Sequence, residues 1–444
     1  MNFNLETIEK FLSNTFEIDC IDICLTQKID NEPIVYAGPG TIYQDKHGQL
    51  QLKLYSKIVD IKKELSPHFK YHRPGKIIAE DNYFSLKAIE MSGTEWIADN
   101  VWVSAHVSFP TRSQVIKSNL KEIKTIEEGS TTDKNSFFII LPGNFKIPCN
   151  EKEDLPNDGW HFNRSVFTAD NIEFEFKKLN NCLIINAVSA PDYLKEDTYV
   201  KLIEAISIVM GLIIRPVVVM NTQQGHSILK IKSVDNSYSN KEVPQPFKHS
   251  LPYDLQSFSY FIGKYLEAID APFSDLFGFW HKINRAWQAD IENSSLSLSV
   301  SIEGLISSYF RELGLPDDEI AQQADKAKQK LNDIDLGERI RGRLLNSICG
   351  LLNNSSPKNA LYRMVRNGLL SKNMVDVWEK LRNKSAHPDK LYKDHRALQK
   401  YIDQIYTCIA LFYRLLFIII KYEGSYIDYS EEGWPEKKMQ EKDE

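Results

Sequence analysis

The chain has 444 residues, which is too long for one ordinary domain and suits two or three. Its apolar fraction of 42% and charged fraction of 26% are those of a globular protein that can bury a core without disulfides. A formal net charge of −6 excludes a broad basic field for nucleic acid, so any contact with RNA has to be local.

Neither a secretory leader nor a membrane span is expected from the sequence. The first ten residues carry acids early and lack the apolar core of a signal peptide. The most apolar run, 409–420, contains Arg414 and is well short of the roughly 20 residues that cross a bilayer. The six cysteines show neither C-x-x-C nor zinc-finger spacing, which is typical of core thiols in a reducing compartment. We therefore expect a cytoplasmic protein with no membrane partner.

The first half of the chain predicts a mostly antiparallel β region. Residues 1–15 have helical apolar spacing, and after them short apolar runs alternate with turn signals about every ten residues. The strand-like segments are 18–25, 33–36, 50–55, 83–89, 96–109, 137–141, 172–177 and 182–188. Residues 45–48 predict a hairpin turn, and Gly38-Pro39-Gly40 follows the second segment.

One predicted helix, 197–210, interrupts these strands. The apolar run 213–220 contains Pro216, which has no N–H to donate, so we expect an edge strand or a strand start there. Residues 1–245 thus predict an α+β region that senses or binds something. Whether it is one domain, or two that divide near residue 95, stays open.

The second half predicts an all-helical bundle. The polar stretch 233–247 has the composition of a linker, which places the main boundary near 240–253, ahead of a helical domain at 254–422. The predicted helices are 254–270, 274–293, 296–313, 317–333, 336–354, 358–370, 372–385 and 392–422. The last is the most apolar and predicts the centre of the bundle. Residues 423–444 are expected to be a charged, weakly structured tail.

The residues with the clearest chemical potential lie between the last two predicted helices. Arg382, Asn383 and His387 fall within six residues and are followed by Pro388. On an unbroken helix, Arg382 and His387 would diverge by roughly 140°. Pro388 disfavours the helical conformation at His387, so the helix should end at 386–387 and free the imidazole to turn towards Arg382.

Such a group suits phosphodiester transfer in RNA. A neutral imidazole can take or give a proton near neutral pH, and a guanidinium can hold phosphate oxygens in two hydrogen bonds. Asn383 can position a phosphate, a ribose hydroxyl or the imidazole ring. RNA supplies its own nucleophile in the 2′-OH, so no metal or cofactor is required, and the products would carry a 2′,3′-cyclic phosphate and a 5′-OH. The chain has no P-loop, dinucleotide-binding, hydrolase-elbow or zincin motif.

Arg-Asn-x-x-x-His in a helical setting resembles the signature of the HEPN superfamily, whose active members are metal-independent ribonucleases. An upstream segment, 296–309, resembles the family's apolar-Glu-apolar helix, with Glu303 as the acid. The resemblance covers roughly 254–422 and is closest to the ApeA-like branch, found in bacterial anti-phage proteins behind a β-rich region. It implies an endoribonuclease with Arg382, Asn383 and His387 as catalytic residues and with Glu303 and Lys384 in support.

The resemblance also implies pairing of two helical domains, cleavage of tRNA or mRNA, a phage-derived trigger and a toxin-like role in abortive infection. Two alternatives remain. The helical half could be a non-catalytic HEPN module that binds RNA or a protein, or it could only dimerise behind a ligand-sensing β region. If the motif is only structural, Arg382 would be a surface ion-pairing side chain, Glu303 would pair with a neighbouring basic residue such as Arg382, and His387 would be a helix cap.

Overall fold

The computed structural model of the chain describes residues 5–59, 75–128, 134–154, 160–179, 181–191, 193–195, 197–223, 225–234, 241–386 and 394–439. The chain divides into two compact units. The β unit comprises Met1–Phe145, Asn150–Glu196 and Arg215–Tyr238, and the helical unit comprises Lys146–Cys149, Asp197–Ile214 and Ser239–Glu444. The fold is α+β with a helical C-terminal region, which confirms the predicted fold class.

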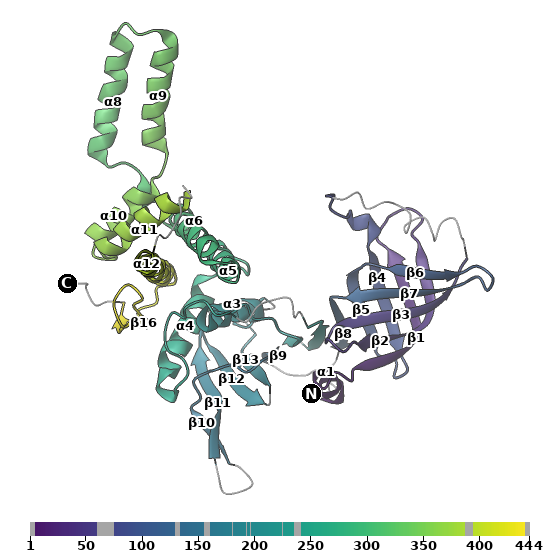
Figure 1. Cartoon of the computed structure of the whole chain (residues 1–444). Helices are drawn as coiled ribbons and strands as arrows, with labels where there is room; N and C mark the ends of the chain where they lie inside the picture. Colours follow the sequence, from purple (N-terminus) through teal and green to yellow (C-terminus); the bar gives the residue numbers. More distant parts are fainter. Residues whose placement is uncertain are drawn as a thin grey trace. The chain divides into compact units, whose positions relative to one another are not determined.

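The strands of the β unit pair antiparallel throughout its described part and form one fifteen-stranded sheet (Figure 1). The short helix α1 (Leu5–Leu12) precedes them. The strands are β1 (Glu17–Gln27), β2 (Val35–Gln44), β3 (Leu50–Lys57), β4 (Phe84–Glu90), β5 (Glu95–Val101), β6 (Ser104–Ser108), β7 (Ser113–Leu120), β8 (Glu122–Glu128), β9 (Asn135–Pro142), β10 (Glu151–Asp154), β11 (Trp160–Ala169), β12 (Ile172–Leu179), β13 (Cys182–Ser189), β14 (Val218–Gln223) and β15 (His226–Lys232).

The strand order makes part of this sheet curl round on itself. The order is β10-β11-β12-β13-β9-β14-β15-β8-β5-β4-β1-β2-β3-β7-β6. Only Lys121 joins β7 to β8, yet five strands separate these two strands in the order. This part of the sheet must therefore bend until β7 and β8 come close together (Figure 1). The enclosed side is apolar, with Ile23, Leu25, Tyr36 and Phe84 fully buried. The sheet runs unbroken past residue 95, because β4 and β5 pair across it.

The strand at 33–36 extends further than its residues suggest. β2 continues through Gly38-Pro39-Gly40, because its neighbour β1 has an irregular register between Cys20 and Ile23, opposite the proline. Because the β1–β2 hydrogen-bond ladder is interrupted there, it needs no N–H from Pro39. The segment 213–220 is corrected in part. β14 does start just after Pro216, but it is no edge strand, because it pairs with both β9 and β15.

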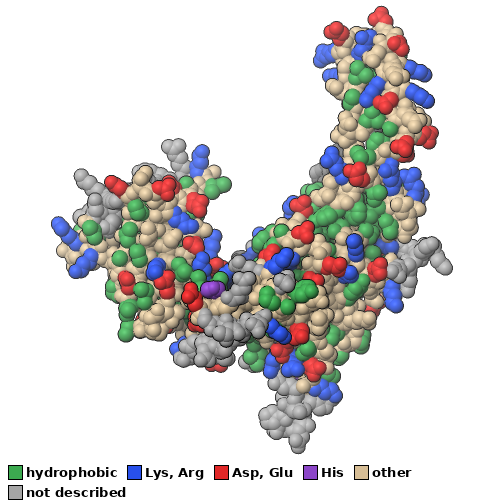
Figure 2. Space-filling view, turned by 180° about the vertical axis from the view of Figure 1, so that it is seen from behind, with side chains coloured by type: hydrophobic (Ala, Val, Ile, Leu, Met, Phe, Trp, Pro, Cys, Tyr) green, Lys and Arg blue, Asp and Glu red, His purple; other side chains and the backbone are tan. Residues whose placement is uncertain are grey.

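The helical unit contains every helix predicted for the second half. The helices are α3 (Thr198–Met210), α4 (Leu255–Ala268), α5 (Asp275–Trp287), α6 (Ile291–Tyr309), α7 (Arg311–Gly314), α8 (Asp318–Asp333), α9 (Glu338–Asn353), α10 (Pro357–Arg366), α11 (Lys372–Ala386) and α12 (His395–Ile420). α8 and α9 form a hairpin that stands away from the bundle (Figure 1), and its surface mixes basic and acidic side chains (Figure 2).

Helix α12 is the apolar centre of this unit. It is the one helix in the described part of the chain that is long and apolar enough to cross a membrane. In its most apolar window 72% is buried inside the structure, which is the behaviour of a core helix. The predicted role of this segment as the centre of the bundle is therefore confirmed.

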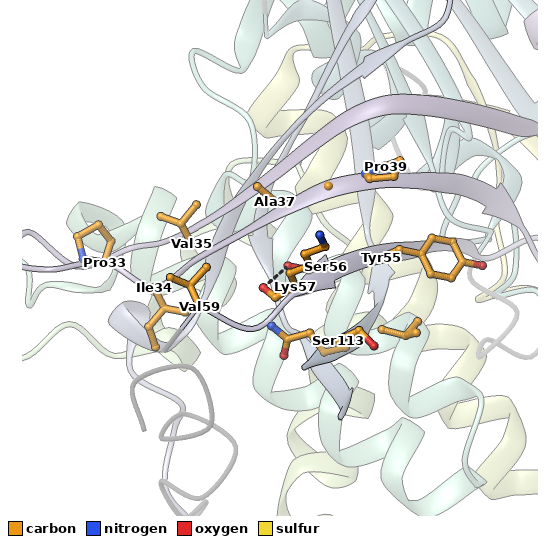
Figure 3. Close-up of a pocket in the computed structure, with 13 residues that line it drawn as sticks. Pro33, Ile34, Val35, Ala37, Pro39, Tyr55, Ser56, Lys57, Val59 and Ser113 are labelled. Atoms are coloured by element: carbon orange, nitrogen blue, oxygen red, sulfur yellow. Dashed lines mark hydrogen bonds between the residues drawn. The ribbon is translucent and has the colours of Figure 1, made fainter. Parts of the chain in front are cut away.

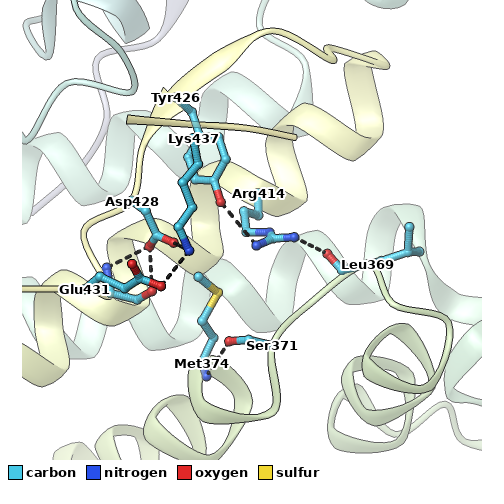
Figure 4. A network of polar contacts seen from close by, with 9 residues as sticks. Leu369, Ser371, Met374, Arg414, Tyr426, Asp428, Glu431 and Lys437 are labelled. Atoms are coloured by element: carbon cyan, nitrogen blue, oxygen red, sulfur yellow. Dashed lines mark hydrogen bonds and ion pairs between the residues drawn. The ribbon is translucent and has the colours of Figure 1, made fainter. Parts of the chain in front are cut away.

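The expected weakly structured tail is wrong for its described residues. After α12, strands β16 (Ser425–Ile427) and β17 (Glu436–Lys438) pair into a small hairpin. Tyr426 and Asp428 are 1% exposed. The Tyr426 hydroxyl accepts a hydrogen bond from Arg414 Nη1 at 3.2 Å, while Nη2 donates to the Leu369 carbonyl at 3.0 Å (Figure 4). The segment folds because it covers α12 and supplies acceptors to a buried guanidinium.

Loss of the Tyr426 hydroxyl should destabilise the helical unit. We expect Tyr426→Phe to lower the free energy of unfolding by about 1.5–3 kcal/mol, because a hydrogen bond to a charged, buried group is removed. Urea denaturation measures this, with Tyr253→Phe as control, since Tyr253 is 73% exposed. Equal stability of the two variants would contradict an anchoring role for Tyr426.

A buried carboxylate joins α3 to α4. Glu204 is 2% exposed and accepts hydrogen bonds from the Tyr265 hydroxyl at 2.9 Å and the Phe273 N–H at 2.6 Å. Burial raises the pKa of Glu204, and the two hydrogen bonds and Lys201 only partly oppose that rise. The folded protein therefore binds the Glu204 proton more tightly than the unfolded chain does.

That pKa shift predicts a pH-dependent effect of Glu204→Gln. The stability linked to the raised pKa is fully present below the unfolded pKa and is lost as pH rises through the folded pKa. Gln keeps the acceptor oxygen without the charge, so Glu204→Gln should gain stability relative to wild type as pH rises. Free energies of unfolding from about pH 4 to about pH 8 test this. The stability of the exposed control Glu312→Gln should differ from that of wild type by the same amount at every pH. The same constant difference for Glu204→Gln would overturn the prediction.

Candidate functional site

The candidate site lies on two helices that pack together, α6 and α11. A capping hydrogen bond from the Asn293 N–H to Asp290 Oδ1, at 2.7 Å, marks the start of α6. Leu298, Ile302, Leu305 and Ile306 then recur at helical spacing and are fully buried. Glu303 follows Ile302 on this helix and is partly exposed, so it sits beside the buried stripe.

Trp378 anchors α11 against α6. Its side chain is 2% exposed, and its indole N–H donates to the Ser299 carbonyl at 3.4 Å. Val375 and Leu381 on the same face are fully buried. Because Arg382 lies one turn beyond Trp378, and Glu303 one turn beyond Ser299, the anchor brings the basic and acidic side chains to the same level.

Arg382 and Glu303 form an ion pair through Arg382 Nε and Glu303 Oε1. The Arg382 side chain is 52% exposed and that of Glu303 is 27% exposed. The ion pair that the sequence suggested between these two residues is therefore present. The pair occupies one edge of the guanidinium, and the exposed remainder can accept a second anionic partner.

The other predicted site residues lie at the end of α11. Asn383 is exposed on the helix, and α11 is described as far as Ala386, so the predicted helix end at 386–387 lies at the limit of the described residues. His387 lies outside the described residues, as does the side chain of Lys384. The next described helix, α12, starts at His395 after Asp394, whose Oδ1 accepts from the Ala397 N–H at 2.8 Å.

The opposite edge of α11 is tied to α10. Lys358 Nζ lies 2.5 Å from Glu379 Oε1, and the Tyr362 hydroxyl donates to Asp376 Oδ1 at 2.6 Å. That hydrogen bond, together with burial and the nearby carboxylates, raises the pKa of Tyr362 to about 12. α11 is thus held by α6 on one side and by α10 on the other, which gives Arg382 a rigid support.

The β unit contains a cavity that no sequence motif predicted. It has a volume of about 940 Å³ and lies where β2, β3 and β7 run side by side (Figure 3). Apolar groups line most of it, including Pro33, Val35, Pro39 and Tyr55. Its size and lining are those of small-molecule sites. Its residues come from three separate strands, so only the strand pairing could have pointed to it.

Among the described residues, no three His, Cys, Asp or Glu side chains gather as metal ligands.

A double-mutant cycle can measure the contribution of the ion pair to folding. For Glu303→Gln and Arg382→Gln we expect a coupling energy of at most about 1 kcal/mol, because both side chains reach solvent. The Lys358–Glu379 pair, also partly exposed, is a matched comparison within the same helices. A coupling above about 2 kcal/mol would make the pair a principal stabilising contact and favour a structural role for Arg382.

Comparisons with known proteins found no match for this chain. No protein-family model matches it, and no curated protein or solved structure matches it significantly. The resemblance to HEPN proteins thus rests on the motif residues Arg382, Asn383 and His387 and on Glu303.

Proposed function

We propose that the protein is a metal-independent endoribonuclease of the HEPN type, with its active group at the end of α11. The observation that carries this proposal is the half-exposed Arg382, paired with Glu303 near the end of α11. An arginine oriented by a carboxylate, with an exposed Asn383 beside it and a histidine five residues further along the sequence, has the composition of a phosphate-handling site.

The roles follow from the chemistry of each group. Arg382 would hold the scissile phosphate and stabilise the charge that develops on its oxygens, while Glu303 keeps the guanidinium in place. His387 would take the proton of the ribose 2′-OH or give one to the departing 5′ oxygen. The 2′ oxygen forms the new bond to phosphorus as the bond to the 5′ oxygen breaks. Asn383 would orient phosphate or imidazole, and Lys384 would add a phosphate contact.

The wider setting is part of the same proposal. We place the protein in the cytoplasm, as a homodimer through its helical domain, cutting tRNA or mRNA in abortive anti-phage defence. The cavity between β2, β3 and β7 supports a sensing role for the β unit, because its volume suits a small ligand. It also supports the alternative of a ligand sensor whose helical half only dimerises.

RNA cleavage by the purified full chain in the presence of EDTA tests the proposal. We expect wild type to cut tRNA or total RNA and leave 2′,3′-cyclic phosphates, and His387→Ala to lose at least ~100-fold in rate, the size of a general acid–base contribution. Arg382→Lys should retain part of the activity, since charge remains but two-point phosphate binding is lost.

His395→Ala is the matched control, because this exposed histidine begins α12 a few residues further on. It should cut like wild type. Cleavage that survives His387→Ala would contradict the assignment of His387. Absence of cleavage by wild type, in buffer and in phage-infected lysate alike, would favour the non-catalytic alternatives.

A further inference from the structure

A second cavity in the helical unit does not include Arg382 and is lined in part by aromatic and acidic side chains. It has a volume of about 550 Å³ and is bordered by α12 and by the loop between β16 and β17. Its aromatic lining is Tyr406, Tyr429 and Trp434, and its acidic lining is Asp403, Glu431 and Glu432. Neither the sequence motif nor the proposed ribonuclease chemistry uses these residues.

The three rings form one cluster. Tyr406 and Trp434 stack with centroids 4.9 Å apart, Tyr429 meets Trp434 edge-on at 5.3 Å, and Tyr406 and Tyr429 are 5.8 Å apart. Trp434 nevertheless remains 50% exposed. A large indole fixed on one side and open on the other presents the negative side of its π-system to an incoming group.

Trp434 is held in place by a backbone conformation that is uncommon for its residue type. Its φ of 50° lies in the left-handed region, and its N–H donates to the Glu431 carbonyl at 3.2 Å. The Tyr429 hydroxyl donates to the Gln245 carbonyl at 2.8 Å, which fixes the preceding part of the loop. The rings are therefore preorganised rather than loosely placed.

Among the described residues, the carboxylates at the cavity outnumber the cations that pair with them. Lys437 Nζ lies 3.3 Å from Asp428 Oδ2 and 2.5 Å from Glu431 Oε1, so its one charge serves two carboxylates (Figure 4). Asp403 accepts a hydrogen bond from the neutral Gln399 side chain at 2.8 Å. Within the described part of the chain, neither Asp403 nor Glu432 has a cation at ion-pair distance.

We propose that this cavity binds an organic cation of the alkylammonium class, seated against the open side of Trp434 and balanced by Asp403 and Glu432. Rings attract a methylated ammonium through their quadrupoles, and carboxylates at the rim supply the opposite charge. A metal ion fits less well, because no three His, Cys, Asp or Glu side chains of the described residues are placed to hold one. The cation could arrive as a free small molecule or as a methylated lysine side chain of a partner protein, which present the same headgroup.

Binding to the full-length protein can be measured with tetramethylammonium and choline by calorimetry and by the proton signals of their methyl groups. Ring currents should shift those signals upfield. The neutral isostere of choline, 3,3-dimethyl-1-butanol, should bind at least ~10-fold more weakly, because it has the shape but not the charge. Equal binding of choline and its isostere would overturn the proposal, as would no binding of any cation, free or peptide-borne.

Two variants assign the site. Trp434→Asn removes the indole but tolerates the left-handed backbone, and should weaken cation binding about tenfold. Glu432→Gln should weaken cation binding severalfold and make the affinity depend less on salt concentration. The remote variant Glu312→Gln should bind as wild type does. Unchanged affinity in both site variants would place binding elsewhere and refute the proposal.

The source of the cation follows from a comparison of ligands. A peptide with trimethyl-lysine that binds at least ~10-fold more tightly than choline, and more tightly than the same peptide with unmodified lysine, would identify a protein partner. Similar affinities for peptide and choline would identify a free small molecule. Because these experiments measure cation binding and not RNA cleavage, a lack of cation binding would not bear on the ribonuclease proposal. A lack of RNA cleavage would likewise not bear on cation binding.

Discussion

The apolar length of α12 is the constraint on which the helical unit depends. A helix that is buried on nearly all sides needs neighbours around its whole circumference. α4, α6 and α11 pack on it, and the C-terminal segment covers more of it. The position of α11, and with it that of Arg382, is therefore a consequence of how α12 is covered. A candidate site on α11 inherits the rigidity of the core beneath it.

Arg414 shows how strict this covering is. Its side chain is 2% exposed within a helix that is otherwise apolar at this level, and burying a guanidinium is costly unless its N–H groups find acceptors. One acceptor is the Leu369 carbonyl, just before α11, and another is the Tyr426 hydroxyl after α12. A single buried cation thus ties the approach to α11 and the last hairpin to the same point of the core.

Much of the fold could be predicted from the sequence, because long amphipathic helices and apolar strands have clear periods. The second half matched helix by helix for this reason. β7 was missed because two of its inward positions are Gln114 and Ser118, which weakens the alternation that marks a strand. The C-terminal hairpin was missed because its charges suggested solvent, whereas Lys437 bridges Asp428 and Glu431 within the structure.

The candidate sites likewise have parts that could be predicted from the sequence and parts that could not. Glu303 and Arg382 could be linked in advance because each stands on a helix with a clear apolar face. The cavities could not be predicted, since their linings combine residues from separate strands, or from a helix and the hairpin loop that follows it. Periodicity predicts which face of an element is buried, but not which hollow two elements leave between them.

The Glu303–Arg382 pair has an electrostatic consequence for any phosphate that approaches. The carboxylate cancels most of the guanidinium's field at long range, so the site does not attract RNA from a distance, in keeping with a chain of net charge −6. At hydrogen-bonding range the geometry of the remaining N–H donors matters more than net charge, and Glu303 fixes that geometry. Such an arrangement favours recognition of a phosphate already delivered by other contacts over capture of any RNA in solution. If the protein is the ribonuclease proposed above, selectivity for a particular RNA, or dependence on a second protomer to deliver it, would follow from an arginine that is paired before a phosphate arrives.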